Sequence, residues 1–115
     1  MGVTTVDLYR NGNATGPRLE HVRIFIADPD VDFVIDSTGE FWVLAGNGKG
    51  VSTWAALDPG WSRPWRLPRG AIYPDSLYVW QDGTPGHWAW APATAMPLAD
   101  YIAALATVGP SFVRA

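Results

Sequence analysis

The sequence predicts a small α+β domain with a strand-rich core and few helices, and three observations support this class. Residues 77–81 and 87–91 are β-branched and aromatic runs on either side of the turn segment 82–86 (DGTPG), which predicts a hairpin. Residues 97–108 begin with proline and carry apolar side chains at helical spacing, which predicts a C-terminal helix. Glycine and proline, 12 and 10 in number, divide the rest into short segments. Residues 1–115 therefore form one domain with its own core.

The first third of the chain contains several stretches with strand character. Residues 3–10 alternate and end at the turn-forming segment 11–13, so we predict a first strand there. Residues 21–27 place three β-branched or apolar residues on one side and predict a second strand, with a short helix as the alternative. Residues 32–36 and 40–45 flank a Ser-Thr-Gly turn and predict a hairpin.

The middle of the chain contains a glycine-rich segment and a loop. Residues 46–54 (GNGKGVSTW) match neither the Walker spacing nor GxGxxG, which favours a turn before a buried strand over a phosphate cradle. Residues 55–68 are rich in tryptophan and proline and predict mostly loop. Three arginines are expected on solvated loop, where they are also available to an acidic partner: Arg63, Arg66 and Arg69.

The hairpin predicts which side chains share a face. If the five-residue loop closes symmetrically, Gln81 lies opposite His87. A slip of one residue would exchange the two faces of the ribbon. With symmetric closure, the face away from Gln81 is an aromatic ladder made of Tyr78, Trp80, Trp88 and Trp90.

Composition excludes several classes of protein. The chain has no cysteine, which excludes a disulfide scaffold and a thiolate metal site. Its formal net charge of −3 argues against general nucleic-acid binding, which usually requires a basic patch. No run approaches the roughly 18 apolar residues of a membrane helix, and the first residues do not resemble a secretory signal. We therefore expect a cytoplasmic protein without membrane contact.

Few residues offer acid–base or nucleophilic chemistry. The two histidines, His21 and His87, lack metal-ligand spacing, and no nucleophile elbow is present, so neither metal-dependent nor triad hydrolysis is predicted. An arginine at a strand end and neighbouring hydroxyls, together with aromatic rings, instead suit a phosphate-bearing aromatic ligand. The residues concerned are Arg10, Ser52, Thr53, Gln81 and His87.

Each of these residues also has a structural interpretation. Arg10 is equally well explained as a surface residue, and Ser52 and Thr53 suit a strand. His87 is also explained as an edge histidine with satisfied hydrogen bonds. The seven tryptophans are more typical of a core than of a ligand platform.

Four motifs together resemble a known family. They are LYR at 8–10, GVSTW at 50–54, LPRGAIYPDSLYVWQD at 67–82 and HWAWAPATAMPLADY at 87–101. In this order they resemble the small ADP-ribosyltransferase-like effector toxins of type VI secretion. The resemblance covers the C-terminal half well and, upstream, little beyond the first strand.

The resemblance implies a fold, a substrate and site residues. The fold is the split, twisted β-sheet of ADP-ribosyltransferases, and NAD is the substrate. Arg10 corresponds to the arginine that binds the NAD phosphate or ribose, and Ser52 with Thr53 to the hydroxyl motif that shapes the nicotinamide pocket. The implied NAD-binding residues are Arg10, Ser52, Thr53, Trp54 and His87, and the implied catalytic residues are Arg10, Ser52, Thr53, Gln81, Asp82 and His87.

The sequence departs from standard transferases at the catalytic carboxylate. Cleavage of the nicotinamide–ribose bond develops positive charge on the ribose, which a carboxylate usually stabilises. Both glutamates, Glu20 and Glu40, lie upstream, so no late glutamate is present and Asp82 is the shorter substitute.

The implied function is that of a bacterial toxin. It would use NAD to modify a cytoplasmic target macromolecule, or act as an NAD glycohydrolase, and a cognate immunity or antitoxin protein would neutralise it. One alternative is a fold relative that binds NAD without turnover. The other is a non-enzymatic binding domain whose exposed tryptophans engage a protein or sugar.

Overall fold

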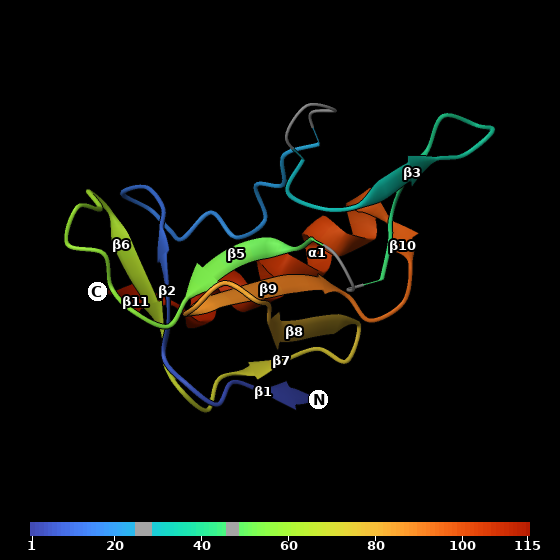
Figure 1. Ribbon diagram of the computed structural model, residues 1–115. Coiled ribbons are helices and arrows are strands. Elements are labelled where there is room, and N and C mark those ends of the chain that lie inside the picture. Colours follow the sequence, from blue (N-terminus) through green and yellow to red (C-terminus); the bar gives the residue numbers. More distant parts are fainter. Residues whose placement is uncertain (25–28, 46–48) are drawn as a thin grey trace.

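The computed structural model describes residues 1–24, 29–45 and 49–115, which form a compact α+β fold of antiparallel sheets with one α-helix near the C-terminus (Figure 1). The helix α1 spans Leu98–Val108 and continues into the short 3-10 helix η1, Gly109–Ser111. The strands are β1 (Gly2–Val3), β2 (Leu8–Asn11), β3 (Phe33–Ile35), β4 (Phe41–Val43), β5 (Val51–Trp54), β6 (Pro64–Leu67), β7 (Ile72–Tyr73), β8 (Leu77–Gln81), β9 (His87–Pro92), β10 (Met96–Pro97) and β11 (Val113–Arg114).

A six-stranded sheet in the order β11-β6-β2-β5-β9-β8 organises the molecule. In Figure 1, α1 runs behind β5 and β9. A smaller sheet, β10-β4-β3, carries the β3–β4 hairpin away from the body, and β1 pairs with β7 below the main sheet. No described helix has the length and apolar character needed to cross a membrane.

The core is centred on Trp90 in β9, whose side chain has no exposed surface. Its indole Nε1 donates to the hydroxyl of Thr53 at 2.9 Å, and the Tyr101 hydroxyl of α1 donates to its carbonyl at 2.6 Å. Burial raises the pKa of Tyr101, so the hydroxyl keeps its proton and acts as the donor. Gly50 passes so close that an added Cβ would lie 2.4 Å from the Trp90 carbonyl oxygen. These contacts join β5, β9 and α1 into one packed unit.

The predicted hairpin and helix are confirmed, with small differences in their bounds. The strands β8 and β9 occupy 77–81 and 87–92, so Pro92 is the last strand residue. The helix begins at Leu98 because Pro97, with an extended backbone, occupies the N-cap position.

The predicted register of this hairpin is wrong by one residue. Gln81 pairs with Trp88 and Trp80 with Ala89, so the four aromatic residues do not share a face. The loop causes the shift: Asp82 accepts from the backbone N–H of Thr84 at 2.9 Å, and Gly86 adopts a φ of 75°. Trp88 and Trp90 therefore lie on the face of the core, while Tyr78 and Trp80 stack on the opposite face at 5.3 Å.

The β3–β4 hairpin is also confirmed, within the bounds 33–35 and 41–43. Asp36 closes its turn by accepting from the backbone N–H and hydroxyl of Thr38, at 2.8 and 2.6 Å, and from the indole of Trp42 at 2.9 Å. These hydrogen bonds, those from Thr38 foremost, lower the pKa of Asp36 to about 2. The carboxylate is therefore ionised at neutral pH and fixes the turn.

Three predictions for residues before the β8–β9 hairpin are wrong. The first strand is broken into β1 and β2 because Thr4 bonds to a neighbouring loop, donating its N–H to the Ala71 carbonyl at 2.9 Å. The stretch 55–68 is not only loop, since Pro64 opens β6, which pairs with β2 and β11 and includes Arg66. The strand predicted for 21–27 is absent at 21–24, and its remaining residues lie outside the described ranges, as do residues 46–48 of the glycine-rich segment 46–54.

Candidate functional site

The site is built on the face of β5 that looks away from the core. Because side chains alternate along a strand, buried Val51 and Thr53 face the core while Ser52 and Trp54 face the other way. His87 lies opposite Trp54 in the β5–β9 ladder, and its ring packs on the indole with centroids 4.6 Å apart. Its Nε2 atom lies 2.7 Å from the Ser52 hydroxyl. The pairing of two central strands therefore fixes a hydroxyl against an imidazole.

Asp82 orients the imidazole from the other side. Its Oδ2 atom lies 2.5 Å from His87 Nδ1, while Oδ1 accepts from the Thr84 N–H at 2.9 Å. The Thr84 backbone hydrogen bond, followed by the contact with His87, lowers the pKa of Asp82, so the carboxylate is ionised and accepts a hydrogen bond from Nδ1–H. In the tautomer that carries its proton on Nδ1, Nε2 is the acceptor for the Ser52 hydroxyl. We call this arrangement the Ser52–His87–Asp82 chain.

Sequence reasoning did not predict the Ser52–His87–Asp82 chain as a unit. The three residues come from β5, the hairpin loop and the start of β9, and no local motif links them. The strand pairing that brings Ser52 to His87 is non-local, which is why the sequence does not predict a serine–histidine–aspartate arrangement. The five-residue spacing of Asp82 and His87 around a turn was the available signal.

Arg10 reaches the same site from β2. Its Nη1 atom donates to the Ser52 carbonyl at 2.7 Å, Nε donates to the Pro17 carbonyl at 3.0 Å and Nη2 to the Arg18 carbonyl at 3.2 Å. A guanidinium has five N–H donors, so one N–H on each terminal nitrogen is left by these bonds. Burial lowers the pKa of Arg10, partly opposed by the charge of Asp30. The side chain is half-buried, which excludes the interpretation of a plain surface arginine.

Two neighbouring cavities meet at Ser52. The arginine lobe, of about 340 Å³, is lined by Arg10, Arg18 and Arg23 among others. The histidine lobe, of about 240 Å³, is lined by Asp82, His87 and Lys49 among others. Arg23, Asp30 and Ser52 line both lobes. The lobes are therefore adjacent, and we treat them as the two halves of one candidate site.

The charge of this site differs from that of the whole chain. The chain has a net charge of −3, yet the two lobes carry more cationic than anionic side chains. The carboxylate of Asp30 is hydrogen-bonded to Arg23, accepting from its backbone N–H at 2.7 Å and its Nε at 3.0 Å.

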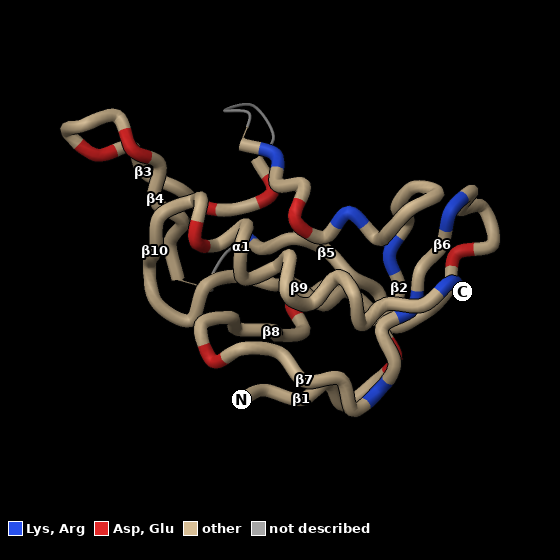
Figure 2. Tube along the Cα trace, turned by 180° about the vertical axis from the view of Figure 1, so that it is seen from behind, with Lys and Arg blue, Asp and Glu red and all other residues tan. Residues whose placement is uncertain are grey.

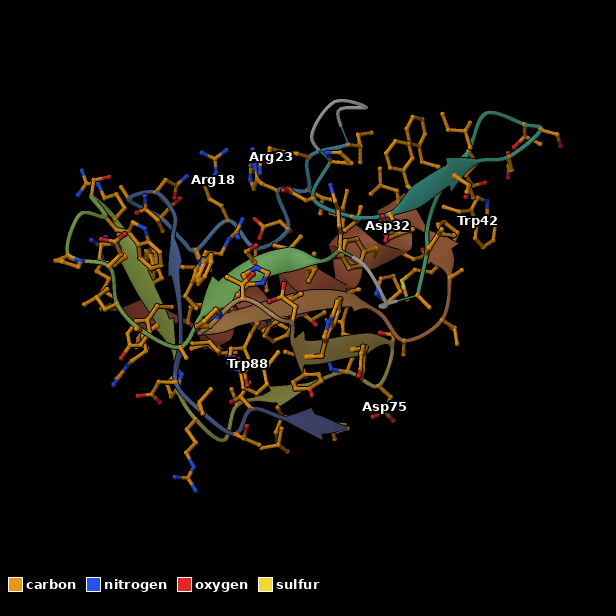
Figure 3. The ribbon with its side chains drawn as sticks, in the orientation of Figure 1. Arg18, Arg23, Asp32, Trp42, Asp75 and Trp88 are labelled. Carbon is orange, nitrogen blue, oxygen red and sulfur yellow. The ribbon has the colours of Figure 1, made fainter. Side chains whose placement is uncertain are left out.

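Most basic residues gather at the β2 and β6 end of the molecule and many acidic ones near β3 (Figure 2). Figure 3 shows Arg18 and Arg23 extending from the segment that passes over β5. The described site is suited to an anion.

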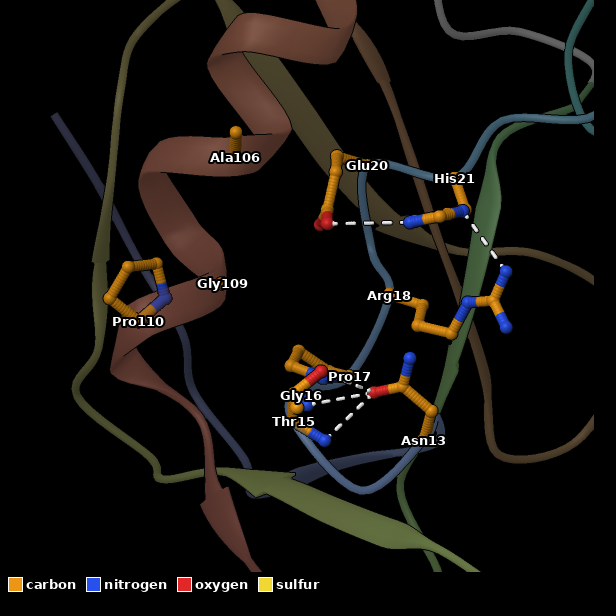
Figure 4. A pocket seen from close by; sticks show the side chains of 10 residues that line it. All are labelled: Asn13, Thr15, Gly16, Pro17, Arg18, Glu20, His21, Ala106, Gly109 and Pro110. Atoms are coloured by element: carbon orange, nitrogen blue, oxygen red, sulfur yellow. Dashed lines mark hydrogen bonds and ion pairs between the residues drawn. The ribbon is translucent and has the colours of Figure 1, made fainter.

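A further cavity of about 330 Å³ lies between this segment and the end of α1 (Figure 4). Its polar groups are bonded to one another: the Asn13 side chain accepts from the N–H groups of Thr15 and Gly16, and Arg18 contacts His21 Nδ1 at 3.1 Å. His21 lies 3.7 Å from Glu20. The residues drawn in Figure 4 include no serine, cysteine or lysine to serve as a nucleophile.

The structure brings together most, but not all, of the predicted site residues. Arg10, Ser52, Asp82 and His87 meet at the two lobes, with Trp54 packed against the imidazole. The placement of Gln81 beside His87 is wrong, because the shifted register puts exposed Gln81 opposite Trp88 on the other face.

Thr53 also lies away from the lobes. It is fully buried, donates to the Trp88 carbonyl at 3.1 Å and accepts from Trp90, so it belongs to the core. Sequence reasoning missed Arg18, Arg23, Asp30 and Lys49, which line the lobes. For Arg18 and Arg23, the sequence signal is their position beside and within the stretch 21–27, which was predicted to be a strand.

Two other observations limit the chemistry of the described residues. No group of three or more His, Asp or Glu side chains among residues 1–24, 29–45 and 49–115 has an arrangement that could hold a metal ion. None of the seven tryptophans, all in the described ranges, is fully exposed. A binding surface of several exposed indoles is therefore not present.

Comparison of the chain with protein-family models, curated proteins and solved structures finds no match in any of the three.

Proposed function

We propose that this protein is an NAD-dependent toxin of the ADP-ribosyltransferase type, with a diverged, split-sheet version of that fold. It would act on a cytoplasmic target macromolecule and be neutralised by a cognate immunity protein. One observation carries the proposal: a cationic lobe around Arg10 adjoins, at Ser52, a lobe that holds an oriented histidine and an ionised carboxylate.

The arginine lobe suits the pyrophosphate of NAD. Arg10 retains one N–H donor on each terminal nitrogen, and Arg18 and Arg23 line the same cavity. Arginine binds phosphate oxygens through charge-assisted hydrogen bonds, often in pairs. Because the carbonyls of Pro17, Arg18 and Ser52 hold the Arg10 guanidinium in place, little ordering would be needed when the anion binds.

The histidine lobe suits the reacting end of NAD. Departure of nicotinamide leaves positive charge on the ribose, and the ionised Asp82 supplies negative charge to this lobe. His87, with Nε2 available as an acceptor, can take the proton of the attacking water or target nucleophile. Until the acceptor enters, the Ser52 hydroxyl is the hydrogen-bond partner of Nε2. In this proposal Asp82, through His87, replaces the late glutamate of standard transferases.

The alternative of a binding domain with exposed tryptophans receives less support. Trp90 is buried and the remaining indoles are half-buried, so none of the tryptophans is fully exposed as this alternative expects.

Expression in the bacterial cytoplasm, with growth and cellular NAD followed together, tests the proposed function. We expect growth arrest, accompanied by NAD loss if water or abundant sites accept the ADP-ribose. If the target is scarce, we expect arrest with NAD intact and transfer of label from labelled NAD to a macromolecule. Soluble, folded wild-type protein that causes neither arrest, NAD loss nor label transfer would contradict the proposal.

A further inference from the structure

Ser52 is held in the way that activates a serine hydroxyl. Its Oγ lies 2.7 Å from His87 Nε2, and His87 Nδ1 lies 2.5 Å from Asp82. A nucleophile bonded to a base, with the base oriented by a third group, is the geometric signature of nucleophilic catalysis on unrelated folds. Ser52 also lines both lobes of the site, so the residue borders space that a substrate can enter.

We infer that Ser52 is a nucleophile that cleaves small esters whose acyl group carries a negative charge. This activity goes beyond the proposed use of NAD, since it needs neither NAD nor a target protein. It makes the same cavity an esterase site, with Ser52 as the residue that becomes acylated.

The reaction balances with water as the only co-reactant. The Ser52 oxygen attacks the ester carbonyl carbon while His87 Nε2 accepts the hydroxyl proton, and the same proton then passes to the departing alcohol as the ester C–O bond breaks. Water next attacks the acyl-serine and gives its proton to Nε2. Release of the carboxylic acid returns that proton to Ser52. Asp82 retains its hydrogen bond to Nδ1 throughout and stabilises the imidazolium form.

The cations of the two lobes taken together select the substrate class. Arg23 and Lys49 in the histidine lobe are balanced by Asp30 and Asp82, and Arg10 and Arg18 of the adjoining lobe give the excess of positive charge. Cationic groups in a recessed site stabilise the oxyanion that develops on the carbonyl oxygen. They also attract a carboxylate at the far end of the acyl chain. An anionic acyl ester is therefore preferred over a neutral one.

Labelling with a fluorophosphonate probe, in the absence of NAD, tests whether Ser52 is activated. We expect a single adduct, located at Ser52 by peptide mass spectrometry, on the wild-type protein. The variants His87→Gln and Asp82→Asn should slow the labelling by about 100-fold or more, because they remove the base or its orientation. Ser76→Ala, at an exposed serine outside both lobes, is the matched control and should label like wild type.

Ester turnover tests the substrate class. We expect hydrolysis of p-nitrophenyl succinate at least about 10-fold faster than that of p-nitrophenyl acetate, which lacks the charge. Near-ultraviolet circular dichroism of each variant establishes that the fold is intact. Folded wild-type protein with no Ser52 adduct, or with labelling that His87→Gln leaves unchanged, would overturn the inference, and equal rates for the two esters would overturn the substrate class. The outcome is independent of the proposed function, because NAD consumption is measured separately.

Discussion

His87→Ala is expected to abolish growth inhibition and to reduce NAD turnover by about 100-fold or more, the usual contribution of a positioned acid or base. The substitution removes the imidazole that contacts both Ser52 and Asp82, at 2.7 and 2.5 Å. It leaves the core intact, because the imidazole lies on the face of β9 opposite Trp88 and Trp90. The measurement is NAD turnover by purified protein, together with growth on expression.

A pair of aspartate variants controls for indirect effects of this substitution. Asp82→Asn should reduce turnover by a similar factor, because the amide no longer fixes the tautomer of His87 as a carboxylate does. Asp36→Asn is matched to it: both carboxylates accept the backbone N–H two residues on in a hairpin turn, but Asp36 lies on the β3–β4 hairpin, away from the lobes. It should leave turnover unchanged. Wild-type turnover by folded His87→Ala would contradict the assigned role.

Trp90→Ala is expected to unfold the protein or nearly so. Truncation of a buried tryptophan costs about 3–5 kcal/mol, against a total stability of about 5–15 kcal/mol for a typical domain. Here the indole has no exposed surface, and its loss also leaves the hydroxyl of Thr53 without its 2.9 Å donor. The measurement is the free energy of unfolding by urea titration.

The control for this prediction is Trp80→Ala. Trp80 is a half-buried tryptophan that stacks on exposed Tyr78 on the other face of the hairpin, so its removal leaves no closed cavity. It should cost clearly less stability than Trp90→Ala. Equal urea midpoints for wild type and Trp90→Ala would refute the central place given to Trp90 in the core.

The sequence predicted the elements whose signals are local. The hairpin of β8 and β9 follows from the turn residues between two aromatic strands, and α1 from Pro97 and helical spacing. The register could not be predicted, because it depends on how Asp82 and Gly86 fold the loop. The strand β6 was missed because its first residue is Pro64, and its partners β2 and β11 are distant in sequence.

The residues of the candidate site likewise include some that the sequence predicts and some that it does not. Arg10, Ser52 and His87 were predicted from residue type, position and resemblance, and the structure places them together. The one-residue error in register separates Gln81 from them, and strand alternation places Thr53 in the core. The arginine lobe could not be predicted because several of its residues belong to an irregular segment. The packing of such a segment leaves no periodic pattern of apolar residues in the sequence.

Isothermal titration calorimetry of the purified protein with NAD tests most directly whether the two lobes form one NAD site. We expect saturable binding that weakens as salt is raised and in the variant Arg18→Ala, which removes a cation from the arginine lobe. Arg69→Ala, at an exposed arginine outside both lobes, should bind like wild type. Folded wild-type protein that shows no binding up to about 1 mM NAD, the upper end of common substrate affinities, would contradict the account.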